Sequence, residues 1–358
     1  MCIRDSPSTP AIDRVRAAHR ENVGADAAHV ASAPATWALI GEHIDHYGGI
    51  AIMGLANIRA AAAVSPRSDG LVKVRLEHTN GETVEDQISL EQVSSLAAEQ
   101  QPSVDSEGQP IEPPAPEGAI AARLGGIIYT MINRQLLTRE TAGADITVVN
   151  DIPDSTGLGA AAAIDIATAL ALLGNADDLH DAPLRARIAE VCSQAVGTFA
   201  RFPALRARHS AALRGAGESI TIIDYADGSV TQAPHMVNKD IAAFALAVPS
   251  DADSLEAVAE IRTRERFIDA ACRAFGTPSL RLLPDAPQRV LEWLAAVHKV
   301  HGTENQPTIA QATAWLTFYS EETERAEGVA RALRSRRGTE LFPPVSYTHL
   351  TLPTKRIV

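Results

Sequence analysis

Cysteine is scarce in this chain, and the few cysteines present form no spaced set. Cys2, Cys192 and Cys272 are far apart and odd in number, and no histidine or other cysteine stands beside them at metal-ligand spacing. This argues against a disulfide-stapled secreted domain and against a cysteine-based metal site. We expect the thiols to be reduced and structural, and we assign no metal ligands to any part of the sequence.

An excess of basic residues is lacking as well. The 32 Lys and Arg residues are outnumbered by 44 Asp and Glu, which gives a formal net charge of −12. Nucleic acids attract basic surfaces, so the sequence predicts no nucleic-acid partner. No apolar run is long enough to cross a bilayer, and residues 1–6 are not followed by the apolar core of a signal peptide. We therefore expect a cytoplasmic protein without a membrane partner.

The chain does have the length and apolar content for a large core. It has 358 residues, of which 46% are hydrophobic, and this size favours two domains. Helical periodicity and apolar runs alternate along it, which favours an α+β fold built from two α/β two-layer lobes. The expected helices span 11–23, 119–137, 160–173, 184–198, 255–275, 286–300 and 308–336; the expected strands span 36–40, 51–64, 71–78, 144–150, 219–225 and 242–248. Residues 101–118 are rich in proline and predict an exposed loop.

Both ends of the chain read as translated adaptor rather than as protein sequence. MCIRDS is the translation of ATGTGTATAAGAGACAG plus one base, and VSYTHL at 345–350 translates the reverse complement, GTCTCTTATACACATCT. This nucleotide string matches a transposon end used to prepare sequencing libraries. We expect residues 1–6 and 345–358 to be artefacts of a gene cut at both ends, so that residues 7–344 carry the fold.

The segment GEHIDHYGG gathers Glu42, His43 and Asp45 in a turn closed by Gly48 and Gly49. Carboxylates accept hydrogen bonds from sugar hydroxyls, imidazole can donate or accept them, and glycine lets a backbone approach a ligand closely. A polyhydroxylated ligand would suit this cluster. A solvated acidic turn is the alternative interpretation.

The longer stretch APATWALIGEHIDHYGG resembles the galactokinase signature, APGRVNLIGEHTDYNGG, with ten identical positions. The resemblance implies membership of the GHMP small-molecule kinase superfamily, whose fold has two lobes with the active site in the cleft between them. It implies that Glu42, His43, Asp45, Gly48 and Gly49 bind a galactose-like sugar. The family's arginine, thought to stabilise the reacting oxygen and phosphate, aligns with Thr36 and is therefore missing.

A glycine turn leads into an alanine-rich helix at DIPDSTGLGAAAAIDIATALAL, residues 151–172. Helix N-termini bind phosphate through free N–H groups, although such turns are commonly only structural. The stretch resembles the superfamily pattern P-x-x-x-G-L-x-S-S-A, which implies binding of ATP with Mg²⁺. The nucleotide-binding positions implied by this resemblance are Pro153, Gly157, Leu158, Gly159, Ala160 and Ala161. Alanine or glycine replaces the serines, and Asp154 adds a negative charge, so we expect weakened binding.

The stretch FARFPALRARHSAAL, residues 199–213, resembles the family segment that ends in P-C-G-I-M-D-Q. The alignment puts Arg208 at the family's catalytic base and His209 at its glutamine. Arginine stays protonated and cannot accept a proton. His209 is a possible substitute base, and a solvated basic turn is the plain alternative. Ile261 stands where the family has a sugar-contacting tyrosine.

These observations lead to one prediction with alternatives. We expect a galactokinase-like protein whose family reaction converts galactose to galactose 1-phosphate, with an N-terminal lobe at 7–185 and a truncated C-terminal lobe at 186–344. No catalytic residue is intact, so impaired transfer with retained sugar or nucleotide binding is the first prediction. An active sugar kinase that uses other residues, and a non-catalytic galactose-sensing regulator, are the alternatives.

Overall fold

The computed structural model describes residues 9–101, 103–104, 110–111, 113–153, 156–174, 178–235, 255–304, 306–337, 340–341 and 343–345. The expected strand at 242–248, Asp154, and all but Val345 of the adaptor-like ends lie outside these residues. In the part of the chain so described, no helix is long and apolar enough to span a membrane.

The chain packs into two compact units, neither of which is a continuous segment. Unit 1 contains Met1–Thr36 and Leu55–Arg214, and unit 2 contains Trp37–Gly54 and Gly215–Val358. The strands β1 (His29–Ile40) and β2 (Ile50–Pro66) each run from one unit into the other. By packing, the chain divides after Arg214. The lobe boundary expected at residue 185 from the sequence remains a prediction.

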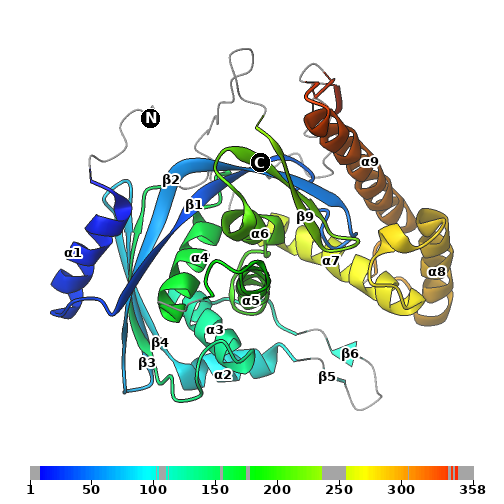
Figure 1. The fold of residues 1–358 in the computed structure, drawn as a ribbon. Helices are drawn as coiled ribbons and strands as arrows, with labels where there is room; N and C mark the ends of the chain where they lie inside the picture. The colour runs from blue at the N-terminus through cyan, green and yellow to red at the C-terminus, as the bar shows by residue number, and fades with distance from the viewer. Residues whose placement is uncertain are drawn as a thin grey trace. The chain divides into compact units, whose positions relative to one another are not determined.

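Unit 1 is built on a mixed sheet in the order β4, β3, β7, β2 (Figure 1). β7 (Ala144–Asn150) pairs antiparallel with the second half of β2, from Ala60 opposite Asn150 to Pro66 opposite Ala144. It pairs parallel with β3 (Leu71–His78), which in turn pairs antiparallel with β4 (Thr83–Ser89). Both faces of β7 are largely buried, as expected for a central strand.

Helices cover both faces of this sheet (Figure 1). α1 (Ala11–Val23) packs its Val15 face against Ala61, Ala63 and Val149, and it ends at Gly24, whose φ of 78° is the left-handed value of a helix C-cap. Helices on the other side include α3, which packs on β3, and α4, which packs on β7. The remaining elements of unit 1 are α2 (Leu90–Glu99), β5 (Ser103–Val104), β6 (Pro110–Ile111), α3 (Ile120–Asn133), α4 (Ala160–Leu173), α5 (Ala182–Phe199) and α6 (Arg206–Arg214).

Unit 2 combines a small antiparallel sheet with long helices. Ile50–Met53 of β2 pair with β8, which pairs with β9. Its largest described core cluster joins Ile44 and Tyr47 to aromatic and aliphatic side chains of α7, α8 and α9. The elements are β8 (Ser219–Asp224), β9 (Ser229–Pro234), α7 (Leu255–Phe275), the 3-10 helix η2 (Leu280–Leu282), α8 (Ala286–His301) and α9 (Ile309–Arg334).

Candidate functional site

The segment from Gly41 to Gly49 forms a tight turn in unit 2. The N–H of Gly48 donates to the carbonyl of Asp45 and the N–H of Gly49 to that of Ile44, both at 2.9 Å. Ile44 is fully buried and Tyr47 nearly so, whereas the predicted sugar ligands Glu42, His43 and Asp45 are half-buried. The apolar side chains of Ile44 and Tyr47 thus anchor the turn in the core. The three predicted polar side chains stand on the same short segment.

The backbone of this turn is strained at one predicted ligand. His43 has a φ of 66°, which side chains other than glycine seldom adopt. Such strain persists where surrounding structure enforces it, and it is common at binding sites. Gly48 has a φ of 88°, and a Cβ atom there would lie 2.5 Å from the side chain of Ser279. Glycine is therefore required at this position by both conformation and space.

Side chains from η2 and α9 hold the turn in place. Glu322, which is 1% exposed, accepts a hydrogen bond from the N–H of Gly41 at 3.1 Å and pairs with Arg325 at 3.1 Å. Arg281 donates to the carbonyl of Gly48 and bridges to Asp224 and Glu327. The ring of Tyr47 stacks on that of Tyr319 at 5.5 Å between centroids. The sequence pattern gave no signal for these contacts, because the partners lie far along the chain.

A charged cluster joins the turn to α7, and it too was missed from the sequence. His46 Nδ1 lies 3.1 Å from Asp269, and Nε2 lies 3.8 Å from Glu265. Burial alone lowers the pKa of His46, but the hydrogen bond to Asp269 and the charges of Asp45, Glu265 and Asp269 raise it to about 9. Burial raises the pKa of Glu265 to about 7, with Asp45 and Asp269 adding to the rise and His46 opposing it.

The glycine turn before α4 lies in unit 1. The side chain of Asn150 accepts from the N–H of Ile152 and donates to its carbonyl, which turns the chain as β7 ends. Gly157 and Gly159 have φ values of 68° and 70°. Gly159 is the N-cap residue of α4. It has no side chain that could accept hydrogen bonds from the N–H groups of the first turn. Pro153, Ala160 and Ala161 are half-buried, Gly157 is exposed and Leu158 is buried.

The structure brings the predicted arginine and base positions into contact at this turn. Nη1 of Arg208 donates to the carbonyl oxygens of Thr36 and Gly157, both at 2.7 Å. The N–H of Thr36 donates to the carbonyl of Leu158 at 3.0 Å. A Cβ atom on Gly159 would lie 2.4 Å from Oγ1 of Thr36 and 3.1 Å from Nη1 of Arg208. A guanidinium from α6 thus fills the space between β1 and the glycine turn.

The interpretation of residues 205–209 as a solvated basic turn is wrong. Arg206–Arg214 form the helix α6, in which Arg208 is 4% exposed and His209 is 2% exposed. The sequence misleads here because two arginines and a histidine in five residues look like a surface segment. Buried oxygen acceptors, absent from the local sequence, satisfy the donors instead. Ile261, at the family's tyrosine position, is also buried, on α7.

The positions of the family's serines in the glycine turn offer no side-chain oxygen to magnesium. Gly159, Ala160 and Ala161 have no side-chain oxygen, and the carbonyl of Gly157 already accepts from Arg208. Within the described ranges, no group of three or more His, Cys, Asp or Glu side chains is placed to hold a metal. The cation of Arg208 further opposes a second cation at this point. The side chains of Gly159, Ala160 and Ala161 therefore do not fit a magnesium ion held by the protein at these positions.

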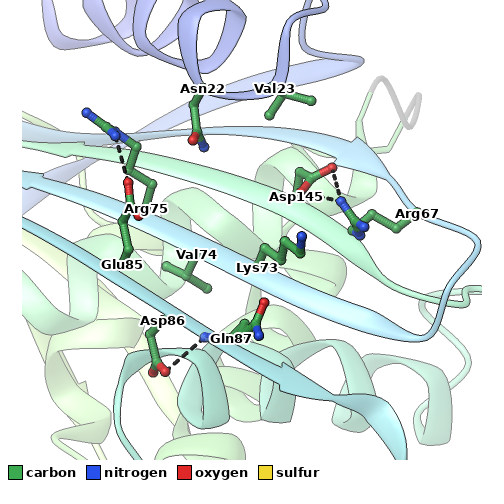
Figure 2. Close-up of a pocket in the computed structure, with 10 residues that line it drawn as sticks. All are labelled: Asn22, Val23, Arg67, Lys73, Val74, Arg75, Glu85, Asp86, Gln87 and Asp145. Carbon is green, nitrogen blue, oxygen red and sulfur yellow. Dashed lines mark hydrogen bonds and ion pairs between the residues drawn. The ribbon is translucent and has the colours of Figure 1, made fainter.

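A hollow of about 480 Å³ lies in unit 1 (Figure 2). Its charged side chains are largely matched with one another: Arg67 bonds Asp145 and Arg75 bonds Glu85, each at 2.8 Å. None of the predicted site residues lines it. The lining residues are Asn22, Val23, Arg67, Lys73, Val74, Arg75, Glu85, Asp86, Gln87 and Asp145.

Comparison with known proteins agrees with the signature. A family model described as the galactokinase galactose-binding signature matches residues 17–66. The galactokinase of Streptomyces coelicolor is 27% identical over 185 residues, which cover 51% of this chain and 41% of the relative. Human galactokinase is 27% identical over 266 residues, which cover 74% of this chain and 61% of the relative. The chain thus spans about two to three fifths of the length of these curated relatives.

The fold has a solved counterpart. Lactococcus lactis galactokinase, solved in complex with galactose, superimposes with a TM-score of 0.61 at 16% identity, covering 97% of this chain and 80% of that one. At this identity the superposition speaks for the fold alone. The signature match and the relatives at 27% identity make this chain similar to galactokinases, and the structural match gives it the galactokinase fold.

Proposed function

We propose that this chain binds a galactose-like sugar and a nucleotide at the family's positions but transfers phosphate very slowly. One observation supports the second part above all others. Arg208 is buried and bonded to two carbonyl oxygens, and the sequence resemblance aligns it with the family's catalytic base. A permanently protonated guanidinium cannot accept the proton of a sugar hydroxyl. General base catalysis contributes about 10²–10⁴-fold, so its loss alone leaves transfer slow.

Sugar binding is assigned to Glu42, His43 and Asp45, with Gly48 and Gly49 allowing close approach of the backbone. Support comes from the match of residues 17–66 to a galactose-binding signature and from the strained, well-anchored turn on which these side chains stand. The nine-residue turn therefore supplies an acceptor-rich surface for hydroxyl groups.

Nucleotide binding is assigned to the backbone around Pro153, Gly157, Leu158 and Gly159 and to the first turn of α4. Amide groups and the positive end of the helix favour phosphate even though the family's serines are replaced at Gly159, Ala160 and Ala161. Because Gly159, Ala160 and Ala161 lack the hydroxyl groups of the family's serines, Mg²⁺ would enter bound to ATP rather than to these residues. We expect weaker affinity for Mg-ATP than in galactokinases that carry the serines.

The biological role that fits these properties is a sugar-responsive regulator, with an active kinase on non-standard residues as the alternative. A cytoplasmic location and the absence of nucleic-acid or membrane partners remain predictions from the composition.

Isothermal titration of the intact chain with galactose and with Mg-ATP, beside a coupled assay of ADP release, tests the proposal. We expect sugar binding with turnover at least about 10²-fold below that of an intact family member. Asp45→Asn should weaken sugar binding, and Glu292→Gln, an exposed change on α8, should not. Ordinary turnover would establish the active kinase instead, and binding of neither ligand would overturn the proposal.

A further inference from the structure

We propose that His209 is a positioning residue: through Asp165 and Ser193 it fixes α6 so that Arg208 holds the glycine turn in a single conformation. The inference deepens the proposed function. Its statement about nucleotide binding rests on that function, whereas the positioning role of His209 does not. His209 was considered from the sequence as a substitute base, and its surroundings assign it this different task.

Four polar side chains, each from a different helix of unit 1, meet in the cluster around His209. Its Nε2 lies 3.3 Å from Oδ2 of Asp165 on α4, and its Nδ1 lies 3.0 Å from Oγ of Ser193 on α5. The other carboxylate oxygen of Asp165 lies 3.0 Å from Nε of Arg123 on α3. All four residues are buried. The cluster therefore links α3, α4, α5 and α6 away from solvent.

Both ring nitrogens of His209 have a polar partner. Oγ of Ser193 lies between the carbonyl of Ala189 at 2.9 Å and Nδ1 of His209 at 3.0 Å. Nε2 lies 3.3 Å from the carboxylate of Asp165, which can only accept, so the ring supplies the hydrogen of this pair, and Arg123 lies beside the other carboxylate oxygen. Breaking such a buried charged network leaves groups unpaired in the interior, which is strongly unfavourable. A slide or rotation of α6 that moves His209 is therefore resisted.

The order Ser193, His209, Asp165 resembles that of a nucleophilic triad, but the surroundings exclude this role. Ser193 is buried in the middle of α5, and its hydroxyl proton is engaged by the helix backbone. A nucleophile needs a substrate within reach, and these buried side chains offer none. The cluster acts on structure rather than on a reacting group.

Arg208 transmits the position of α6 to the glycine turn, since it precedes His209 in the same helix. Its Nη1 bonds the carbonyls of Thr36 and Gly157, and there is no room for a Cβ atom at Gly159 beside Thr36 and Arg208. These contacts tie both sides of the turn to one guanidinium. When His209 no longer fixes α6, the guanidinium of Arg208 is no longer held at the carbonyls of Thr36 and Gly157, and the backbone of the glycine turn becomes more mobile.

Hydrogen exchange of the unliganded intact chain tests the inference without requiring nucleotide binding. We expect His209→Ala to accelerate amide exchange of a peptide covering residues 156–163 about tenfold, the effect of losing a hydrogen-bond contribution of about 1.4 kcal/mol. Ile128→Ala, a buried packing change in α3, is the control for a general loss of stability. Equal acceleration of the turn in both variants, or none in His209→Ala, would overturn the inference.

Ser193→Ala is the second variant, because it removes one partner of His209 and leaves the ring in place. We expect a smaller acceleration confined to the same peptide, and its absence would contradict the assigned role even if His209→Ala fails to fold.

Titration with Mg-ATP and with galactose supplies the second readout. His209→Ala should weaken nucleotide binding about tenfold relative to the unaltered chain, while sugar affinity changes less than about twofold. Loss of both affinities together would indicate general unfolding and overturn the specific role. If the unaltered chain binds no nucleotide, the nucleotide part of the proposed function fails, and the exchange of residues 156–163 decides the positioning role by itself.

Discussion

Nη1 of Arg208 lies 2.7 Å from the carbonyl oxygen of Thr36, which precedes it by 172 residues. The sequence resemblance predicts that Thr36 stands at the family's arginine and Arg208 at its catalytic base, and these two residues touch one another. A positive charge is therefore present beside position 36, although a different segment supplies it. The two positions predicted to be altered are therefore in direct contact within unit 1.

Restoring the family's aspartate through Arg208→Asp should destabilise unit 1 rather than restore catalysis. The carbonyls of Thr36 and Gly157 would lose their donor and a carboxylate would be buried next to them, at a cost of about 3–5 kcal/mol. Denaturant unfolding of Arg208→Asp and of the unaltered chain measures this difference in the free energy of unfolding. Arg206→Asp, the same charge change on the same helix at a half-exposed site, should cost below about 1 kcal/mol. Comparable costs for the two variants would count against the buried role of Arg208.

The double variant Thr36→Arg with Arg208→Asp should be more stable than the sum of the single variants indicates. Thr36→Arg alone places two guanidinium groups together, whereas the pair restores opposite charges in contact. We expect a coupling energy of about 1–3 kcal/mol from a double-mutant cycle of unfolding free energies. Additive effects would mean that the two positions do not interact. A gain in phosphoryl transfer by the double variant alone would also support the alignment.

The two glycines of the phosphate turn should respond differently to alanine. Both have positive φ, but a Cβ atom on Gly157 meets nothing within 4 Å, whereas on Gly159 it lies 2.4 Å from Oγ1 of Thr36. Gly157→Ala should cost about 1–2 kcal/mol for backbone strain alone. Gly159→Ala should cost about 1–3 kcal/mol more, because side chains must move. The reverse ranking in thermal or denaturant unfolding would contradict the packing described for Arg208.

Stability should fall as the pH rises, because of the cluster at His46. The pKa of His46 is about 9 in the folded chain against an ordinary value of 6.5, so its contribution is complete below about pH 6.5 and is lost as pH passes 9. At about 1.4 kcal/mol per pH unit, this amounts to about 3 kcal/mol at most. Glu265 acts in the same direction between its ordinary pKa of 4.5 and about 7. His46→Gln should flatten the upper part of a plot of Tm against pH, and Glu265→Gln the lower part.

Periodicity predicted much of the fold because it depends on local burial. The spans of α1, α4, α7, β3 and β7 agree with the expected ones, since each has a regular apolar face or an unbroken apolar core. β4 was missed because Glu85, Asp86 and Gln87 interrupt its apolar pattern on a half-exposed face, and the helix α2 after it was missed too. β9, in which only Ala233 is buried, was missed for a similar reason.

The candidate site was predictable only where it is local. Glu42, His43 and Asp45 are neighbours in sequence, as are the residues of the glycine turn. The burial of Arg208 depends on the carbonyl of Thr36, and the raised pKa of His46 depends on a helix more than 200 residues later. Such tertiary partners leave no periodic signal near the residue they affect.

The hydrogen bond from Gly41 to Glu322 joins residues 281 positions apart, and it sets an order of events during synthesis. The signature segment leaves the ribosome well before η2, which supplies Arg281, and α9, which supplies Glu322. While the helices of unit 1 are being completed, the nascent signature segment therefore lacks the contacts to Arg281 and Glu322 that hold it in the folded chain. A ribosome-stalled chain ending before α9 should accordingly have a protected unit 1 and a protease-sensitive Gly41–Gly49 segment.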